Sequence, residues 1–141
     1  MKPEIFFVIW SIFATIGLAV FFTGSRRSEK LFVGLNLNDL KFRERGASGY
    51  SKKNIITRFG GASRALDVIV TETEMCIKGI FSTFTFIGTK YDLTHRVPLD
   101  KITNVTQSGN KTYISFVSKE GNHDIVLRLK DSNGFIRAIK S

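Results

Sequence analysis

The feature that most constrains this chain is a run of twenty uncharged residues, 5–24, that is rich in Phe, Ile, Val and Leu. At about 1.5 Å of rise per residue, a helix of that length covers roughly 30 Å, the thickness of the hydrocarbon core of a bilayer. A helix also satisfies its backbone amides internally where water is absent. Residues 1–24 are therefore predicted to form a transmembrane anchor.

A cleaved secretory signal is the alternative interpretation of the same segment. Lys2 fits a charged n-region, and residues 17–19 are Gly-Leu-Ala, with small side chains near a possible cleavage site. The apolar run nevertheless exceeds the usual h-region of about 7–15 residues, and its end, Val-Phe-Phe at 20–22, is bulky. These features favour an uncleaved anchor, and cleavage stays open.

Basic residues near the anchor predict its orientation. They cluster after the run, whereas only Lys2 and the terminal amine precede it. Because positive segments stay on the cytoplasmic side, the N-terminus is expected outside and the C-terminal part in the cytoplasm. The chain has one cysteine, Cys76, and so forms no internal disulfide, which agrees with a reducing compartment.

The segment 25–62 concentrates the positive charge of the chain. It carries nine Lys and Arg against three Asp and Glu, whereas residues 63–141 carry eleven against eight. Each basic residue near an anionic leaflet contributes on the order of 1 kcal/mol of attraction. We expect a basic juxtamembrane segment that contacts anionic lipid headgroups, although topology signals and solvated side chains would explain the same residues. The nine are Arg26, Arg27, Lys30, Lys41, Arg43, Arg45, Lys52, Lys53 and Arg58.

Nucleic acid is not an expected partner of this basic segment, because no nucleic-acid-binding motif accompanies the positive charge.

Within 25–62 the residues 40–43 (LKFR) alternate between apolar and basic side chains and are compatible with a first strand. The glycines at 46–49 (GASG) indicate a bend after it. The spacing of this run does not match a nucleotide-binding loop.

From residue 63 onward, apolar residues recur at every second position between turn residues, which predicts antiparallel strands. A hairpin is expected around the turn 72–74, further strands over 91–107, and successive hairpins around 108–110 and 120–122. Pro98 marks an edge or a bulge. The period then changes, and Ser132 is expected to cap a C-terminal helix that has Phe135, Ile136 and Ile139 on one face.

Residues 63–141 resemble GRAM and bacterial PH-like domains. Residues 66–78 (LDVIVTETEMCIK) are similar to the strand, Thr-acidic turn and strand that open these domains. Residues 95–105 (HRVPLDKITNV) are similar to their IPL-x-x-I-x-x-V strand, and 135–139 to their closing helix. The resemblance implies a mainly-β PH-like domain, an antiparallel, partly open barrel of six to seven strands with a C-terminal helix.

That resemblance implies a non-catalytic adaptor or scaffold, here at the inner face of a bacterial inner membrane. Its expected partners are the bilayer, anionic lipid, and an unidentified membrane protein or a second copy of the chain. The fold alone does not decide inositol-lipid specificity, and the first hairpin carries no convincing basic motif for it. The alternative function is a signal-processed or outward-facing ligand-binding domain of the cell envelope, and a hydrolase that uses a histidine is a third.

Enzyme chemistry finds little support in the residue spacing. His95 and His123 are the only histidines, and neither has a partner at a known metal-ligand spacing. Asp92 with His95, or His123 with Asp124, would suit acid–base chemistry, but polar residues at strand ends explain them more simply. Cys76 has no evident activating group. No catalytic residue, no metal and no cofactor are therefore expected.

Large apolar residues also gather where a hairpin tip is expected. Phe84, Phe86 and Ile87 are followed by Gly88 and Lys90. Such a tip would enter the headgroup region of a membrane or a pocket of a partner, and core packing is the alternative.

Overall fold

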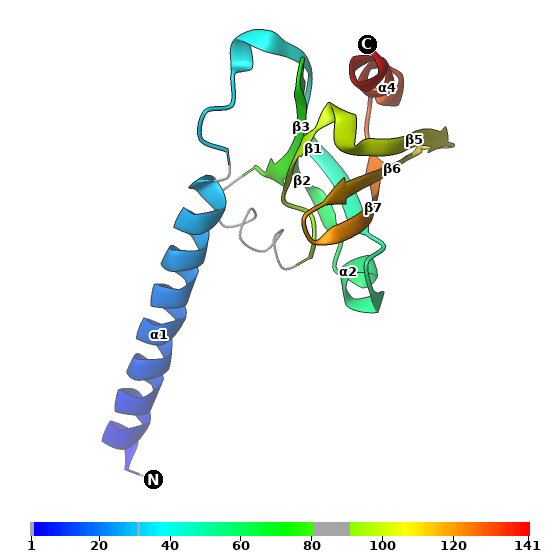
Figure 1. The fold of residues 1–141 in the computed structure, drawn as a ribbon. Coiled ribbons are helices and arrows are strands. Elements are labelled where there is room, and N and C mark those ends of the chain that lie inside the picture. Colours follow the sequence, from blue (N-terminus) through cyan, green and yellow to red (C-terminus); the bar gives the residue numbers. More distant parts are fainter. Residues whose placement is uncertain (1, 31, 81–90) are drawn as a thin grey trace.

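The computed structural model describes residues 2–30, 32–80 and 91–141, with the side chains of the N-terminal helix described as far as Ala19. That helix, α1 (Pro3–Lys30), has 28 residues and projects away from the β-sheet that follows (Figure 1). The helix predicted from the apolar run is therefore confirmed. Among the described residues, none of the helices is both long and apolar enough to cross a membrane, so the predicted span is not found.

Helix α1 exposes large apolar side chains on all of its sides. Ten of them between Ile5 and Leu18 are 42–70% exposed. Six of the ten are consecutive, residues 5–10, and at 3.6 residues per turn they point in every direction around the helix axis. A helix that is apolar all round is typical of one buried in lipid or in other protein, rather than one lying on its own domain.

Seven strands of the described residues form a single antiparallel sheet in the order β4-β3-β2-β1-β7-β6-β5. The six to seven strands and the C-terminal helix expected from the sequence are confirmed, and the sheet is open, with β4 and β5 at its edges. The elements are η1 (Leu37–Asp39), β1 (Leu40–Ser51), α2 (Ile55–Phe59), β2 (Ala62–Thr71), β3 (Glu74–Gly79), β4 (His95–Pro98), η2 (Leu99–Lys101), β5 (Ile102–Ser108), β6 (Lys111–Ser118), β7 (Gly121–Arg128) and α4 (Ser132–Lys140).

Strand β1 is the central strand, because it pairs with β2 on one side and β7 on the other. The first strand expected at 40–43 is thus present, and the bend expected at 46–49 is wrong. The register to β2 shifts between Arg45 and Ala47 and again between Ala47 and Gly49, and Gly46 has a φ of +84°. The glycines therefore mark bulges within a continuous strand.

The predicted hairpins are present: β2 pairs with β3, and β6 pairs with β5 and with β7. Pro98 ends the edge strand β4, opposite Glu74, as its missing N–H donor requires. Strand β2 differs from the half-buried strand that its alternation suggested. Asp67 and Ile69, on its other face, are buried as well.

The core lies between the inner face of the sheet and α4. Val68, Met75, Ile114 and Leu127 are almost fully buried there, and so is Phe135 of α4. The helix packs on β1, β2 and β5, so the sheet curves around it. The N-cap of α4 is Asp131, whose carboxylate accepts the Gly134 N–H at 2.8 Å, and not Ser132 as expected.

The segment that follows α1 lies against the outer face of the sheet. Arg96 Nη1 donates to the Val33 carbonyl at 2.9 Å, and Lys78 Nζ lies 5.4 Å from the centre of the Phe32 ring. These contacts join the segment that follows α1 to β3 and β4.

Candidate functional site

The short helix α2 sits on a rigid turn at the end of β1. Asn54 caps it: its side chain accepts the Thr57 N–H at 2.8 Å, and the Thr57 hydroxyl accepts the Asn54 N–H at 3.0 Å. The Thr57 hydroxyl is also 3.2 Å from the Ser51 carbonyl, to which it donates, and Thr57 is buried. This capping box holds the helix in place although it has only five residues.

The outer side of α2 is apolar and exposed. Ile55, Ile56 and Phe59 are 74%, 72% and 85% exposed. Fully burying one such side chain contributes about 1.5–3 kcal/mol of stabilisation. Burial of all three against a partner or a membrane would therefore be strongly favourable. In the sequence the three are flanked by Lys52, Lys53 and Arg58, which are exposed as well. We refer to these six residues as the α2 tip.

A buried polar network lies directly behind the α2 tip and centres on Asp92. The Asp92 carboxylate accepts hydrogen bonds from the Ser51 hydroxyl at 2.6 Å and faces His123 Nδ1 at 3.0 Å. His95 Nε2 lies 3.2 Å from the same carboxylate and 2.8 Å from the Asp92 carbonyl. Asp92, which has a φ of +57°, thus contacts His95 with both its backbone carbonyl and its side-chain carboxylate.

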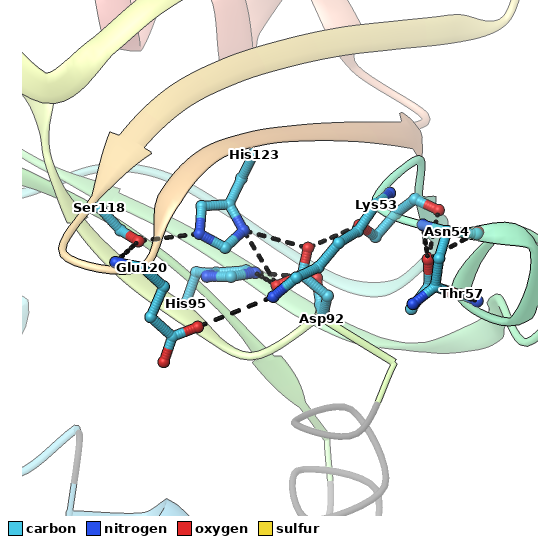
Figure 2. A network of polar contacts seen from close by, with 9 residues as sticks. Lys53, Asn54, Thr57, Asp92, His95, Ser118, Glu120 and His123 are labelled. Atoms are coloured by element: carbon cyan, nitrogen blue, oxygen red, sulfur yellow. Dashed lines mark hydrogen bonds and ion pairs between the residues drawn. The ribbon is translucent and has the colours of Figure 1, made fainter.

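His123 extends this network to the β6–β7 turn. Its Nε2 lies 2.8 Å from the Ser118 hydroxyl, which also accepts the Glu120 N–H at 3.1 Å. The His123 ring stacks on Phe116 at 5.1 Å, and the His95 ring contacts Phe116 edge-on at 4.9 Å. Figure 2 shows the resulting chain of polar side chains, from Ser118 through His123 and Asp92 towards Lys53 and the start of α2.

The network is buried and charged. Exposed fractions of the side chains are 7% for Asp92, 12% for His95 and 2% for His123. Burial alone would raise the pKa of Asp92, but hydrogen bonds from His95, Ser51 and His123 outweigh it and hold that pKa well below its usual range. Asp92 is therefore an ionised carboxylate that the surrounding donors stabilise.

The network is connected to the α2 tip through Ser51. The Ser51 hydroxyl, which donates to Asp92, accepts the Lys53 N–H at 3.2 Å. On the far side Lys53 Nζ lies 3.8 Å from Glu120 of the β6–β7 turn. The backbone that leads into α2 is thus connected to the buried Asp92 carboxylate by hydrogen bonds through Ser51.

The line Ser118–His123–Asp92 follows the order of a serine–histidine–carboxylate relay. Ser118, however, lies in a hairpin turn where its hydroxyl already accepts the Glu120 N–H, a pattern typical of turn stabilisation. A nucleophile would also need N–H donors aimed at a developing oxyanion. The contacts of Ser118 with described residues match the structural role better than catalysis.

No sequence pattern combines all three of Asp92, His95 and His123. Asp92 and His95 are three residues apart, but His123 lies on β7, and only the fold brings it to them. The Asp92–His95 pair that was weighed from sequence is present, whereas His123 contacts Asp92 rather than its neighbour Asp124, which instead accepts from the Ser115 hydroxyl. A three-dimensional contact between the two histidines has no signal in one sequence.

The nine basic residues expected to bind headgroups fall into three groups. Arg26, Arg27 and Lys30 lie in the last turns of α1, Lys41, Arg43 and Arg45 in the first half of β1, and Lys52, Lys53 and Arg58 in the α2 tip. Arg43 forms a two-point ion pair with the buried Asp67, at 2.8 and 3.2 Å. Lys41 donates to the Ser141 hydroxyl at 3.3 Å.

Arg43 is therefore engaged inside the fold. In the α2 tip, Lys53 approaches Glu120 and Lys52 lies over the Tyr113 ring, and both stay exposed beside the apolar residues. Phe84, Phe86 and Ile87, the expected insertion residues, lie outside the described residues. The exposed apolar residues of α2 were not singled out from the sequence.

Comparison with models of known protein families and with curated proteins found no match to this chain.

Proposed function

We propose that this protein is a non-catalytic adaptor at a membrane surface, anchored by α1 and contacting anionic lipid through the α2 tip. The observation that carries the proposal is that α1 exposes large apolar side chains on all sides, ten of them between Ile5 and Leu18. Such a surface is stable only in lipid or against other apolar surface. The uncharged sequence continues to Gly24, which supports insertion into a bilayer.

The α2 tip is the second support. Its three exposed apolar side chains are flanked by cationic ones, the pattern of surfaces that lie at a lipid interface. Apolar burial and attraction to anionic headgroups then act on the same few residues. We therefore assign the proposed lipid contact to Lys52, Lys53 and Arg58, and not to Arg43, which pairs with Asp67.

The β unit is proposed to be a PH/GRAM-like binding domain. What supports this is the arrangement of two antiparallel meanders, β1–β4 and β5–β7, which are joined by pairing of β1 with β7, and the C-terminal helix packed on them, together with the sequence resemblance. Such a domain would hold another membrane protein, or a second copy of the chain, close to the bilayer. The proposal assigns it no catalytic residue.

Attachment and orientation are tested together in cells that produce the full chain. The chain is expected to stay with the membrane fraction at alkaline pH. In a Cys76→Ser background, a membrane-impermeant maleimide is expected to label Lys2→Cys and not Ser141→Cys. Release of the chain at alkaline pH would contradict the anchor. Labelling of Ser141→Cys would favour the outward-facing alternative, and loss of the N-terminal peptide would favour a cleaved signal.

Lipid contact of the α2 tip is tested in the full chain reconstituted in nanodiscs. An environment-sensitive fluorophore on Phe59→Cys, in the Cys76→Ser background, is expected to shift to the blue in anionic discs and less in neutral ones. The matched control is Val117→Cys, an exposed apolar position on β6 with 41% exposure. Equal, water-like emission at both positions in anionic discs would contradict the contact.

A further inference from the structure

We propose that Asp92, His95 and His123 bind a divalent transition-metal ion, with Zn²⁺ the first ion to test. One ligand atom of each residue lies within 4.8 Å of the other two. Two imidazoles and one carboxylate form a donor set that suits Zn²⁺ and related ions and does not suit Mg²⁺ or Ca²⁺, which prefer oxygen ligands alone. The inference is independent of the proposed membrane function.

Two of the three ligand distances already match a tetrahedral site. Asp92 Oδ1 lies 3.2 Å from His95 Nε2 and 3.0 Å from His123 Nδ1. Ligand atoms bound to Zn²⁺ at about 2.0–2.1 Å are about 3.3 Å apart across a tetrahedral edge. The two histidine nitrogens lie within 4.8 Å of each other, and binding of the ion would require the rings, whose centres are 4.9 Å apart, to rotate so that these nitrogens come closer.

The surroundings supply the outer hydrogen bonds that metal ligands usually have. When His123 Nδ1 binds the ion, its proton lies on Nε2, which then donates to the Ser118 hydroxyl at 2.8 Å. The second carboxylate oxygen of Asp92 is held by the Ser51 hydroxyl at 2.6 Å. The Phe116 ring covers the site with an apolar surface that limits the access of water.

The charges also suit a divalent cation. One ionised carboxylate and two neutral imidazoles would give the site, with its divalent ion, a net charge of +1. This net charge is common in sites with an open ligand position. The Asp92 carbonyl, 2.8 Å from His95 Nε2, or a water molecule would take the fourth position. Without the ion, hydrogen bonds between the same three residues hold the site in nearly the same arrangement.

An ion at this site would connect distant parts of the sheet. His95 lies on the edge strand β4, and His123 lies on β7 beyond β3, β2 and β1 in the strand order. Asp92 additionally connects to β1 through Ser51. The ion would therefore act as a cross-link across the curved sheet, and the folded chain would be stabilised by mass action when the ion is present.

The test uses the tag-free full chain in detergent after treatment with a chelator. We expect binding of one Zn²⁺ per chain by calorimetry, an increase in Tm with Zn²⁺ and not with Mg²⁺, and a visible Co²⁺ spectrum typical of nitrogen and oxygen ligands. A His95→Gln variant is expected to weaken Zn²⁺ binding at least about tenfold. The matched control Asp124→Asn, which changes an exposed carboxylate beside His123, is expected to bind like the wild type.

The Co²⁺ spectrum of the wild type keeps the proposal falsifiable if a variant does not fold. Absence of Zn²⁺ binding by the wild-type chain would overturn the assignment. So would retention of the wild-type affinity by His95→Gln, or a sulfur-to-metal absorption band that implicates Cys76.

Discussion

At the scale of single residues, Cys76 is the side chain whose chemistry the fold changes most. It has no exposed surface, and burial, followed by the negative charge of Glu74, raises the pKa of its thiol to about 12. Because the thiolate is the nucleophile, alkylation by iodoacetamide at about pH 8 is expected to be at least a hundredfold slower in the native chain than in urea. Equal rates would show that Cys76 is accessible.

The same shift makes the stability depend on alkaline pH. The pKa is raised on folding, so the stabilisation by the neutral thiol is fully present below its unfolded pKa of about 8.5 and is lost as pH rises towards 12. The difference in urea midpoint between the wild type and Cys76→Ala is therefore expected to decrease from about pH 8 to about pH 11. A pH-independent difference would contradict the shift.

Arg43 illustrates how the fold reassigns a residue. Its sequence context indicated a headgroup contact, but its guanidinium pairs with Asp67, whose side chain is only 3% exposed. Arg43→Ala leaves a buried carboxylate unpaired and is expected to lower the free energy of unfolding by about 1–3 kcal/mol, measured by urea titration. The exposed Lys52→Ala serves as the control and is expected to change it by less than about 0.5 kcal/mol.

The residue-level predictions succeeded where local chemistry decides and failed where contacts are long-range. Cys76, which was expected to be packed or half-exposed because its sequence neighbours offer no activating group, is buried. The contact of His123 with Asp92 and His95 was not foreseeable, because His95 and His123 are 28 positions apart and no sequence spacing encodes the curvature that brings β7 close to β4. The exposure of Ile55 and Phe59 was also hidden, since an apolar residue ordinarily predicts burial.

At the scale of elements, alternation and turn residues located the β2–β3 and β6–β7 hairpins, and the change of period located α4. Glycine was the element-level signal that misled. Residues 46–49 were interpreted as a bend, yet β1 passes through them with two register shifts. Only the neighbouring strand explains why Gly49 is small there: a Cβ would lie 2.7 Å from a Leu127 methyl and 2.9 Å from the Val126 carbonyl.

That close approach makes a prediction for β1. Gly49→Ala is expected to push β1 and β7 apart and to lower the free energy of unfolding by about 1–3 kcal/mol, because the Val126 carbonyl belongs to backbone and cannot move aside. Urea titration followed by circular dichroism measures the change. A wild-type midpoint would mean that β7 yields without cost.

At the scale of the whole molecule, the sheet extends further towards the N-terminus than the resemblance suggested. The resemblance covered residues 63–141, but β1 begins at Leu40 and joins β2 to β7. The pattern of residues 25–62, short apolar pieces between glycines, contained too little alternation to reveal a strand of this length. The positive net charge of residues 25–62 was the stronger signal, but net charge indicates which partners a segment attracts and not how its strands pair.

The position of β1 predicts which fragments fold. Residues 32–141 contain the whole sheet, α4 and the core, and are expected to unfold cooperatively in urea. Residues 63–141 lack the strand between β2 and β7 and are expected to give no cooperative transition. Circular dichroism and urea titration of both fragments provide the measurement, and a cooperative transition of the shorter one would show that β2–β4 and β5–β7 associate without β1.

The central place of β1 also governs the order of events during synthesis. Ser48 pairs with Arg128, a residue that the ribosome adds 80 positions later. Until then β1 has β2 as a neighbour on one side, and its other edge offers unpaired N–H and C=O groups to any other chain. The sheet can therefore be completed only after β7 has been made, and a chain truncated before residue 121 would be aggregation-prone and protease-sensitive.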